Sequence, residues 1–454
     1  MNLLNIIISL SSIVYAIDLD VHSYSSLCDA ITTTSQAVLT YYDGFKPLGV
    51  VGVFEPPYYW WEAGEAWGGF INAWYFCQND TWQSLIYDSL MHQRGSHKDY
   101  VPANQSTTEG NDDQVFWGIA AMEAAERNFP NPPDDEPDWL SLAETVADSM
   151  DSRWDTQNCG GGLRWQIFTW NNGYNYKNTV SNGGLFHLAA RLARYTTNDN
   201  YLDIAEKVWD WLTDVGFVQS NGTILSVFDG ASIDNNCQEL IPYQWTYNYG
   251  LLISGCAYLH SHTGDQKWFD RVLSLLHTIK IMFFTNDIMY EQACEGVKTC
   301  DNDQKSFKSV FSRFLGQTAV LIPDLNESIR PLLEASAVAA AKTCNGTVPG
   351  TGRANACGVQ WTSGSFDNNA GLGQELSAME VFTSVLAINE TTIGAFSVPF
   401  SKNTGGNSTG GVVLNTDRQV DHGFQKKKTI DSVWAGLLTA ISFVFFIIVG
   451  ILLI

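Results

Sequence analysis

Two adjacent carboxylates, Asp112 and Asp113, combine a residue type and a spacing that suit acid/base chemistry. Cleavage of a glycosidic bond needs two carboxyl groups around it, about 5–5.5 Å apart for retention of anomeric configuration and about 6.5–9.5 Å apart for inversion. Neighbouring residues at a helix start can place their carboxyls near the shorter separation. Because like charges repel, one of the two also gains a raised pKa, as an acid catalyst requires. The pair is therefore a candidate catalytic dyad.

Helix capping is the alternative interpretation of Asn111, Asp112 and Asp113. Asp and Asn side chains accept orphan N–H groups at helix starts, and acidic residues there gain about 0.3–1 kcal/mol from the helix dipole. A helix cap needs only one acceptor, however. A second carboxylate on a buried helix lowers stability, so it is expected there only if it has a function. Local sequence alone favours the cap, so the decision depends on where the helix lies.

Further polar and aromatic residues resemble parts of a binding site, many of them at the starts of other apolar helical segments. Flat sugar faces pack on aromatic rings, which makes five aromatic residues candidates: Trp60, Trp61, Trp117, Trp165 and Tyr247. The polar candidates are Lys177, Asn178, Asn182, Asp229 and Asn248. Asp229 is either a turn residue or an acceptor for sugar hydroxyls, and Lys177 is either a cation in the site or a solvated loop residue.

A repeat of roughly sixty residues must position these groups. A capping Asp or Asn followed by an aromatic or apolar residue recurs near residues 80, 138, 199, 265 and 326, where amphipathic helices are expected to start. Between them, helices that are apolar on most faces begin near residues 64, 113, 179, 247, 306 and 369, a pattern typical of buried helices. With a first helix near residues 25–42, about twelve helices fill roughly residues 20–392.

This pattern predicts an all-α fold, an (α/α)6 toroid in which six outer helices surround six inner ones, as one domain over residues 17–396. If alternate helices run the same way, the starts of all the inner helices gather at one mouth, and Asp112 and Asp113 lie in it. That placement favours catalysis over capping. An open helical solenoid is the alternative; it would need polar end caps, and the sequence shows no distinct ones.

Both ends of the chain carry targeting patterns. Residues 1–16 contain an apolar run and a small-residue exit, which predicts a signal peptide, with a buried first helix as the alternative. Residues 433–454 are apolar, uncharged and long enough to span a bilayer, and the cluster Lys426–Lys428 precedes them. The position of that cluster favours a GPI-attachment signal over a genuine membrane anchor. Residues 397–432 then form a flexible, exposed linker with the attachment near Asn415 or Asp421.

We therefore expect secretion through the ER and GPI anchoring at the outer face of the plasma membrane or the cell wall. Sequons agree with this route and stand at Asn79, Asn104, Asn221, Asn326, Asn345, Asn389 and Asn407. Nine cysteines predict disulfides and one leftover thiol. The expected bonds are Cys294–Cys300, Cys344–Cys357 and two among Cys28, Cys77, Cys159 and Cys237, with Cys256 free and buried.

Charge and motifs also limit the partners. Lys and Arg total 25 against 48 Asp and Glu, a net charge of −23, which makes nucleic acid a poor partner. No Cys-x-x-Cys or His-Glu-x-x-His motif is present, so we expect no metal site and no cofactor.

Four motifs resemble glycoside hydrolase family 76, the endo-1,6-α-mannanases. They are Asn111–Gln114, Cys159–Gln166, Tyr176–Asn182 and Trp245–Gly250, and the resemblance extends over the chain to about residue 392. With its two terminal signals the chain is similar to the fungal cell-wall branch of Dfg/Dcw-type proteins. The resemblance implies an (α/α)6 fold and a retaining mechanism with Asp112 as nucleophile and Asp113 as acid/base. It also implies that Asp229, Tyr247 and Asn248 lie in the sugar pocket.

The expected function is that of a retaining endo-α-1,6-mannosidase or transglycosylase at the fungal cell surface. The resemblance implies a mannan or GPI-glycan donor, a possible wall-glucan acceptor and membrane attachment through a GPI lipid. For the fungal branch, the resemblance implies cleavage of the mannose core of GPI anchors and transfer of the attached protein onto wall glucan. Two rival hypotheses are a non-catalytic mannan-binding scaffold protein of the wall, and an inverting glycosidase that uses a distant carboxylate such as Asp229.

Overall fold

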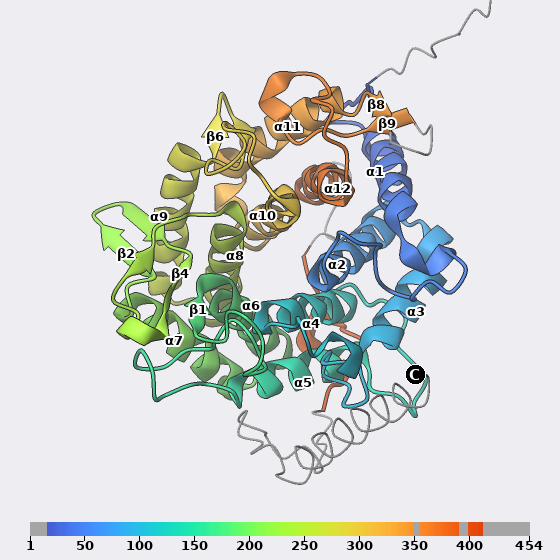
Figure 1. The fold of residues 1–454 in the computed structure, drawn as a ribbon. Helices are drawn as coiled ribbons and strands as arrows, with labels where there is room; N and C mark the ends of the chain where they lie inside the picture. The colour runs from blue at the N-terminus through green and yellow to red at the C-terminus, as the bar shows by residue number, and fades with distance from the viewer. Residues whose placement is uncertain (1–15, 348–353, 390–397, 412–454) are drawn as a thin grey trace, which may run out of the picture. The chain divides into compact units, whose positions relative to one another are not determined.

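A ring of helix pairs dominates the computed structural model, which describes residues 16–347, 354–389 and 398–411. In this part of the chain, six inner helices surround the axis and six outer helices surround them (Figure 1). The inner helices are α2 (Trp60–Cys77), α4 (Asn111–Glu126), α6 (Thr179–Thr196), α8 (Thr246–Thr263), α10 (Asn302–Leu321) and α12 (Leu372–Ile388). The outer helices are α1 (Tyr24–Val38), α3 (Gln83–Gln93), α5 (Trp139–Asp151), α7 (Asp199–Asp214), α9 (Gln266–Met282) and α11 (Asn326–Thr343).

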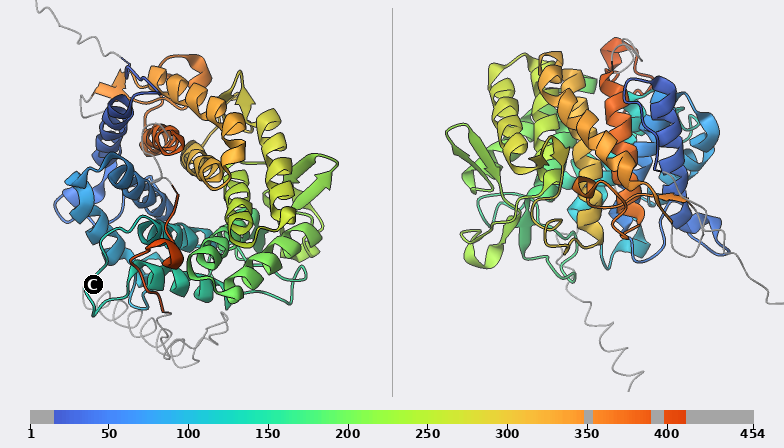
Figure 2. Two further views of the ribbon diagram at one scale, coloured as in Figure 1. Left: turned by 180° about the vertical axis from the view of Figure 1, so that it is seen from behind. Right: turned by 90° about the horizontal axis from the view of Figure 1, so that it is seen from above.

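Closure of this ring confirms the predicted (α/α)6 toroid. Helix α12 packs against α10 on one side and against α2 on the other, so the last inner helix meets the first. The helices lie side by side in the wall of the barrel when it is seen from above (Figure 2). An open solenoid, the alternative, would leave these two helices apart, and it is therefore wrong.

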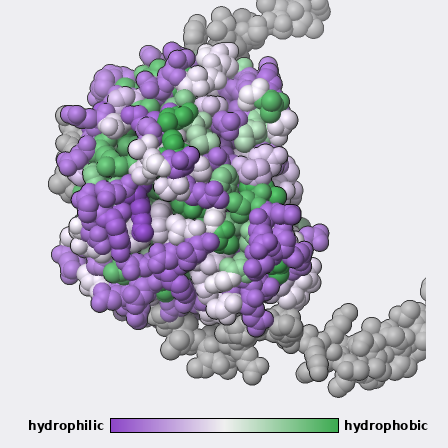
Figure 3. Space-filling model, turned by 90° about the vertical axis from the view of Figure 1, so that its left-hand side faces the viewer, coloured by the Kyte–Doolittle hydropathy of each residue, from purple (hydrophilic) through white to green (hydrophobic). Residues whose placement is uncertain are grey.

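The burial of each helix follows from its sequence. Every residue of α12 is buried, as expected for a helix that is apolar on most faces. Helix α7 instead buries one stripe, which includes Tyr201, Ala205, Val208 and Leu212. The polar residues between them face outward, and hydrophilic side chains cover much of the side of the molecule shown in Figure 3. Inner and outer helices are thus distinguished by hydrophobic pattern alone.

Ion pairs also lie among the inner helices. Arg313 of α10 contacts Glu65 of α2 at 3.0 Å and Glu380 of α12 at 2.5 Å. Arg191 of α6 contacts Glu123 and Glu126 of α4 at 2.7 and 2.6 Å. All of these side chains are almost completely buried, so each charge depends on its partners. The pairs thus join adjacent inner helices, α4 with α6 and α10 with α12, and also join α10 to α2 past the intervening α12.

Short strands occupy the connections that lead from an outer helix to the next inner helix. A three-stranded antiparallel sheet contains β1 (Tyr176–Asn178), β4 (Gly230–Ser232) and β5 (Leu240–Ile241), with Lys177 opposite Ala231. Three two-stranded hairpins pair β2 (Val218–Asn221) with β3 (Ile224–Val227), β6 (Phe284–Thr285) with β7 (Ile288–Met289), and β8 (Gly346–Thr347) with β9 (Ala354–Ala356). Because outer helices end where inner helices begin, all of these strands lie at the mouth.

Residues 398–411 contradict one expectation. They were predicted to be part of a flexible linker, yet they pack on the domain as a strap (residues 398–411, red in Figure 2). The Phe400 N–H donates to the Glu126 carbonyl at 2.9 Å, and the Thr409 N–H donates to Asp138 Oδ2 at 2.6 Å. Ser408 is 2% exposed beneath Tyr195. Backbone groups in this stretch find partners on α4 and α5, so it is ordered despite its Gly, Ser and Asn content.

Four disulfides confirm the two predicted local pairs and settle the pairing of the other four cysteines, which the sequence left open. They join Cys28 to Cys77, Cys159 to Cys237, Cys294 to Cys300 and Cys344 to Cys357, and Cys256 is buried and free. The predicted GPI signal at 433–454, residues 412–432 and residues 1–15 of the predicted signal peptide lie outside the described residues. Within the described ranges, no helix has the length and apolar character needed to cross a membrane.

The sequons differ in exposure. Asn104, Asn221 and Asn407 are exposed, and Asn79, Asn326 and Asn345 are half-buried. Asn389 is only 4% exposed, so its expected glycosylation does not agree with this fold. The use of the other six sequons stays a prediction.

Candidate active site

The aspartate pair lies in the first turn of α4, at the mouth of the barrel. Asp113 Oδ2 accepts the Gly110 N–H at 2.7 Å, so this carboxylate caps its own helix. Capping and a catalytic position are therefore compatible in one residue. Burial, and then the charge of Asp113, raises the pKa of Asp112 well above its usual range. Burial raises the pKa of Asp113 to about 7, against the Gly110 hydrogen bond, and the charge of Asp303 adds to the rise.

The loop before α6 holds the start of α4 in place. Gly110 pairs with Gln166 in an isolated β-bridge, and the Asn111 N–H donates to the Trp165 carbonyl at 2.7 Å. A Cβ at Gly110 would overlap with Asp112 Oδ1, so only glycine fits there. The half-buried Trp165 side chain hydrogen-bonds Asp112, which partly opposes the rise in its pKa. Trp165 is thus placed beside the dyad, as a sugar-binding residue should be.

A third carboxylate, Asp303, faces the dyad from α10. Its Oδ1 accepts the Trp61 indole N–H at 2.7 Å, which connects the starts of α2 and α10. Burial raises the pKa of Asp303 to about 6. Asp303 was not among the predicted site residues. The sequence Asp301-Asn302-Asp303 at the start of an inner helix repeats the Asn-Asp pattern of Asn111-Asp112, and that similarity is the signal that could have found Asp303.

Glu62 lies under this part of the mouth and is almost completely buried. It accepts the Tyr59 N–H at 2.7 Å through Oε2 and the Ser306 hydroxyl at 2.7 Å through Oε1. Burial, reinforced by the charge of Asp303, raises its pKa to about 8. Glu62 therefore keeps its proton at neutral pH.

Tyr247 and Asp229 form the opposite part of the mouth. The Tyr247 ring stacks on Phe307 with 3.9 Å between the ring centroids, and its pKa is raised by burial and by the charges of Asp229 and Asp112. Asp229 accepts hydrogen bonds from the Tyr176 hydroxyl and from the Trp245 side chain. The carboxyl group of Asp229 thus lies near Tyr247, whose hydroxyl is also influenced by Asp112, which favours the hydroxyl-acceptor interpretation over a simple turn residue.

Three of the aromatic candidates differ in what they can contact. Trp61 is 9% exposed and packs on Phe116 with centroids 4.7 Å apart. Trp60 is 7% exposed and stacks on Trp117 at 5.0 Å. Trp117 has no exposed surface because Trp60 and Tyr100 cover its two faces. The expectation that Trp117 contacts sugar is therefore wrong, and its role is in the core.

Both interpretations of Lys177 are also wrong. The side chain is fully buried, and Nζ donates to the carbonyls of Asp155, Asn158 and Gly161 at 3.1, 2.8 and 2.6 Å. This cation is neither solvated nor directed into the mouth. It holds the loop that carries Trp165.

The asparagine candidates are structural in this conformation. Asn178 caps α6 by accepting the Ser181 N–H at 3.2 Å. Asn182 is fully buried and exchanges hydrogen bonds with the backbone of Leu163 at 2.8 and 3.1 Å. Asn248 is fully buried, and neither of its amide atoms has a hydrogen-bond partner within the described residues. Asn182 and Asn248 therefore have no surface that a sugar can reach, and Asn178 is only 5% exposed.

The mouth thus collects three half-buried aspartates, Asp112, Asp113 and Asp303, with Asp229 beside Tyr247. Trp61, Trp165 and Tyr247 supply aromatic surface. Across residues 16–347, 354–389 and 398–411, no group of three His, Cys, Asp or Glu side chains is arranged to hold a metal ion. Carboxyls that retain protons near neutral pH, next to aromatic rings, can perform acid/base chemistry on a neutral sugar.

Known proteins were compared with this chain. The model of glycosyl hydrolase family 76 matches residues 26–394. The mannan endo-1,6-alpha-mannosidase DCW1 of Candida glabrata is 50% identical over 408 residues, which cover 90% of this chain and 89% of the relative. DCW1 of Saccharomyces cerevisiae is 48% identical, with coverage of 94% and 92%.

Solved structures agree with the fold. Dfg5 from Chaetomium thermophilum in complex with glucosamine is 36% identical, has a TM-score of 0.80, and covers 91% of this chain and 100% of its own. An inactive variant of an alpha-1,6-mannanase from Salegentibacter sp., in complex with alpha-1,6-mannotetrose, has a TM-score of 0.63 at 16% identity, with coverage of 80% and 99%. At that identity the second likeness concerns the fold alone. Together with the closed helical ring and its family model, the relatives show that this chain belongs to glycosyl hydrolase family 76 and is a glycoside hydrolase.

Proposed function

We propose that the protein is a retaining endo-α-1,6-mannosidase or transglycosylase that uses Asp112 and Asp113 on a mannose-containing glycan. The observation that carries the proposal is the position of the two adjacent carboxyls at the start of α4, in a mouth lined by Trp61, Trp165 and Tyr247. Adjacent carboxyls suit the short separation of retaining enzymes. The names of the relatives supply the substrate class, since the yeast proteins are called mannan endo-1,6-alpha-mannosidases.

In this mechanism Asp112 attacks the anomeric carbon while Asp113 donates its proton to the leaving oxygen. A covalent glycosyl-enzyme forms, and Asp113 then takes a proton from water or from a sugar hydroxyl that attacks the anomeric carbon and releases Asp112. The raised pKa of Asp113, about 7, lets it hold a proton at mildly acidic pH.

In the free enzyme, the hydrogen bonds of the pair favour a proton on Asp112 and not on Asp113. The Gly110 N–H favours the ionised form of Asp113, whereas Asp112 Oδ1 is buried without a hydrogen-bond partner in the described structure. The proton shared by the pair therefore resides mainly on Asp112 until substrate binds. Our assignment requires that the bound sugar moves this proton to Asp113.

The donor and the cellular site belong to the same proposal. The donor is mannan or the mannose core of a GPI glycan, and the acceptor is water or wall glucan. Secretion and a GPI lipid at the plasma membrane or wall, expected from the two ends of the sequence, would keep the enzyme on the same surface as an anchored substrate. Sharing a surface raises the effective concentration of the two partners.

Conversion of Asp112 to Asn tests the catalytic assignment. We expect turnover of α-1,6-mannan to be lost while the circular dichroism spectrum and the melting temperature stay close to those of the native protein. Incubation of the native protein with a fluorinated mannosyl donor should add one mannosyl mass on Asp112. Full activity of the Asn variant contradicts the assignment.

The alternatives have different outcomes. A protein that binds mannan, forms no adduct and cleaves nothing is the wall scaffold. Release of a product with inverted anomeric configuration supports the inverting mechanism with a distant carboxylate such as Asp229. A GPI-glycan donor supplied with and without a glucan acceptor then separates transfer from hydrolysis, because only transfer yields a product that contains both glycans.

A further inference from the structure

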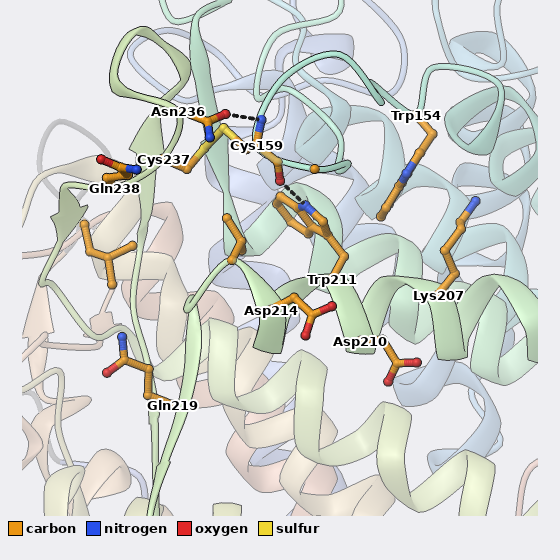
Figure 4. Close-up of a pocket in the computed structure, with 13 residues that line it drawn as sticks. Trp154, Cys159, Lys207, Asp210, Trp211, Asp214, Gln219, Asn236, Cys237 and Gln238 are labelled. Atoms are coloured by element: carbon orange, nitrogen blue, oxygen red, sulfur yellow. Dashed lines mark hydrogen bonds between the residues drawn. A yellow bond between two sulfur atoms is a disulfide. The ribbon is translucent and has the colours of Figure 1, made fainter.

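A second cavity, drawn in Figure 4, lies at the mouth end of the barrel, and neither Asp112 nor Asp113 lines it. It is bounded by the C-terminal half of α7 and by residues 154–160 and 236–240, and we call it the rim cavity. Its volume is about 780 Å³, within the range of natural ligand sites. None of the side chains that line the mouth around Asp112 and Asp113 also lines the rim cavity.

The floor of the rim cavity is rigid. The disulfide between Cys159 and Cys237 joins its two loops. The Trp211 indole N–H donates to the Cys159 carbonyl at 3.0 Å, and the Cys159 N–H donates to Asn236 Oδ1 at 2.8 Å. These contacts fix the indole and the amide before any ligand arrives, which lowers the entropic cost of binding.

The walls of the cavity combine an aromatic ring with polar groups. Trp154 is half-exposed, and Asp210 and Asp214 lie on the other side, one helical turn apart on α7. The exposed amides of Gln219 and Gln238 complete the rim. Carboxylates accept hydroxyl protons, amides both donate and accept, and an indole packs on the apolar face of a pyranose.

The charge of the lining excludes an anionic ligand. Among the described residues that line the cavity, Lys207 is the single cation, and its Nζ lies 4.6 Å from the centre of the Trp154 ring and pairs with Asp151. Its charge is thus already engaged, whereas Asp210 and Asp214 both face the cavity. Two carboxylates beside a neutralised cation favour a neutral, hydroxyl-rich ligand.

One loop connects the rim cavity to the dyad. The chain runs from Trp154 through Gly161, whose carbonyl is held by Lys177, to Trp165, whose carbonyl accepts the Asn111 N–H. Lys177 itself precedes Asn178 at the start of α6. A ligand in the rim cavity therefore contacts the same segment that orients the start of α4.

We propose that the rim cavity is an accessory binding site for a neutral hexose oligosaccharide, a distal stretch of the polysaccharide that the dyad processes. The class of ligand rests on the cavity, and the identity of the polymer rests on the proposed function. Such a site retains a long chain near the mouth while its other part reaches Asp112 and Asp113, so it favours polymers over short substrates.

The test compares a double variant, Asp214→Ala/Gln238→Ala, with the matched control Asp203→Ala, which removes the same charge from the same helix away from the cavity. Native gels that contain α-1,6-mannan or laminarin measure binding of the full-length chain. We expect the dissociation constant of the double variant for the polysaccharide to be about fivefold to tenfold higher than that of the native protein, because one or two hydrogen bonds are lost. The double variant is therefore retarded less in the gel. Its kcat/KM should fall similarly on mannan but stay unchanged on an aryl α-mannobioside. The control should behave as native in both assays.

The proposal is overturned if native protein and double variant are retarded to the same degree in both gels. It is also overturned if the control variant loses as much retardation and kcat/KM as the double variant. A second variant, Asp210→Ala, should also bind glycan more weakly, so the result does not depend on the folding of the double variant alone. Both variants are compared only if their melting temperatures match that of the native protein. If native protein cleaves no mannoside, the proposed function fails, but the gels still decide whether the rim cavity binds glycan. Retardation by laminarin alone supports the glycan site and assigns it to a glucan.

Discussion

Asp112 and Asp113 receive their acid/base properties from side chains that are distant in the sequence. Adjacent aspartates on an exposed helix would both be ionised at neutral pH. Here burial raises both pKa values, and Asp303 of α10 adds its charge. The Gly110 N–H opposes the change at Asp113 alone. The two carboxyls are therefore unequal before a substrate arrives, with the proton favoured on Asp112, and substrate binding must reverse this order before Asp113 can act as the acid.

Replacement of Asp303 by Asn should shift the alkaline limb of the pH–activity profile to lower pH. The charge of Asp303 raises the pKa of Asp113, so its removal lets Asp113 lose its proton at lower pH. If Asp113 must be protonated, activity declines as pH rises through its pKa, and the midpoint moves down. Asn retains an oxygen that can accept the Trp61 N–H. Initial rates on α-1,6-mannan between about pH 4 and 9 measure the shift.

Asp270→Asn on outer helix α9 is the control, because Asp270 is exposed and distant in the fold from the mouth. An unchanged midpoint in the Asp303 variant, or an equal shift in the control, would show that Asp303 does not act on the dyad electrostatically.

The sequence predicted the position of some individual site residues correctly and of others wrongly. Asp112, Asp113, Trp61 and Tyr247 lie at the mouth, as the helix pattern indicated. Trp165 and Asp229 lie there too, but they stand on loops that the helix pattern does not place, and for Asp229 the family resemblance gave the position. Trp117 and Lys177 were predicted at the mouth but do not line it. Tyr100 covers one face of the Trp117 ring, and three backbone carbonyls surround the Lys177 ammonium group, and neither contact can be recognised from the local sequence. Partners far apart in the chain decide such cases.

The inner helices approach one another most closely where small residues face a neighbour. A Cβ added at Gly64 of α2 would lie 2.9 Å from the backbone nitrogen of Trp117 and 3.0 Å from the carbonyl carbon of Phe116. Backbone of α4 cannot move away as a flexible side chain can. The packing of α2 on α4 therefore requires glycine at this position.

Gly64→Ala should lower the free energy of unfolding by about 1–3 kcal/mol, the usual cost of overpacking. The matched control is Gly296→Ala, where an added Cβ meets no atom within 4 Å. Urea unfolding followed by circular dichroism measures both. A Gly64→Ala variant as stable as the native protein would mean that α2 and α4 separate without cost.

The sixty-residue pattern predicted every helix pair, but it placed the first residue of two inner helices about one turn too late in the sequence. Apolar periodicity suggested starts near Gly64 and Ser306, whereas α2 begins at Trp60 and α10 at Asn302. The first turn of α10 is polar because it faces the mouth, so its hydrophobic periodicity starts one turn after the helix does. The same offset hid Asp303. The first turn of α2 instead contains Trp60, Trp61 and Glu62, which the sequence suggested as a motif of the mouth and not as part of the helix.

The strap of residues 398–411 extends the folded domain past the last helix. Asp138 Oδ2 accepts N–H groups from Thr409 and Gly410 at 2.6 and 3.1 Å, while Oδ1 caps α5 at Ser141. Composition suggested a linker, because glycine and serine are common in flexible segments. The buried acceptors on α4 and α5 that order the strap are invisible in its own sequence.

Asp138→Asn should loosen the strap. One amide oxygen cannot serve both the α5 cap and the strap N–H groups, and the charge that strengthens these bonds is lost. We expect stability to fall by about 1–3 kcal/mol and residues 398–411 to exchange amide hydrogens faster. Hydrogen exchange read by mass spectrometry checks this, with Asp203→Asn as control. Unchanged protection of residues 398–411 would contradict the role of Asp138.

Buried carboxyls at the mouth also make the stability of the whole domain depend on pH. Burial raises the pKa of Glu62 to about 8, of Glu291 to about 8, of Asp113 to about 7 and of Asp303 to about 6. Unfolded carboxyls titrate near about pH 4. Between about pH 5 and 8 the folded state therefore binds more protons than the unfolded state, and the free energy of unfolding falls as pH rises. Glu123, whose pKa is held at about 2 by Arg191 and Arg127 against burial, loses its contribution only at more acidic pH.

We accordingly expect the melting temperature to be higher at about pH 5 than at about pH 8. Each such carboxyl contributes up to about 1.4 kcal/mol per pH unit between its unfolded and folded pKa values. Glu62→Gln should flatten this dependence, because glutamine carries no proton to lose, whereas Glu327→Gln at an exposed position of α11 should leave the slope unchanged. Calorimetry at several pH values across this range gives the slopes. A melting temperature that rises toward alkaline pH would mean that the mouth carboxyls ionise freely in the folded protein, and the shared proton required of Asp112 and Asp113 would then be lost as well.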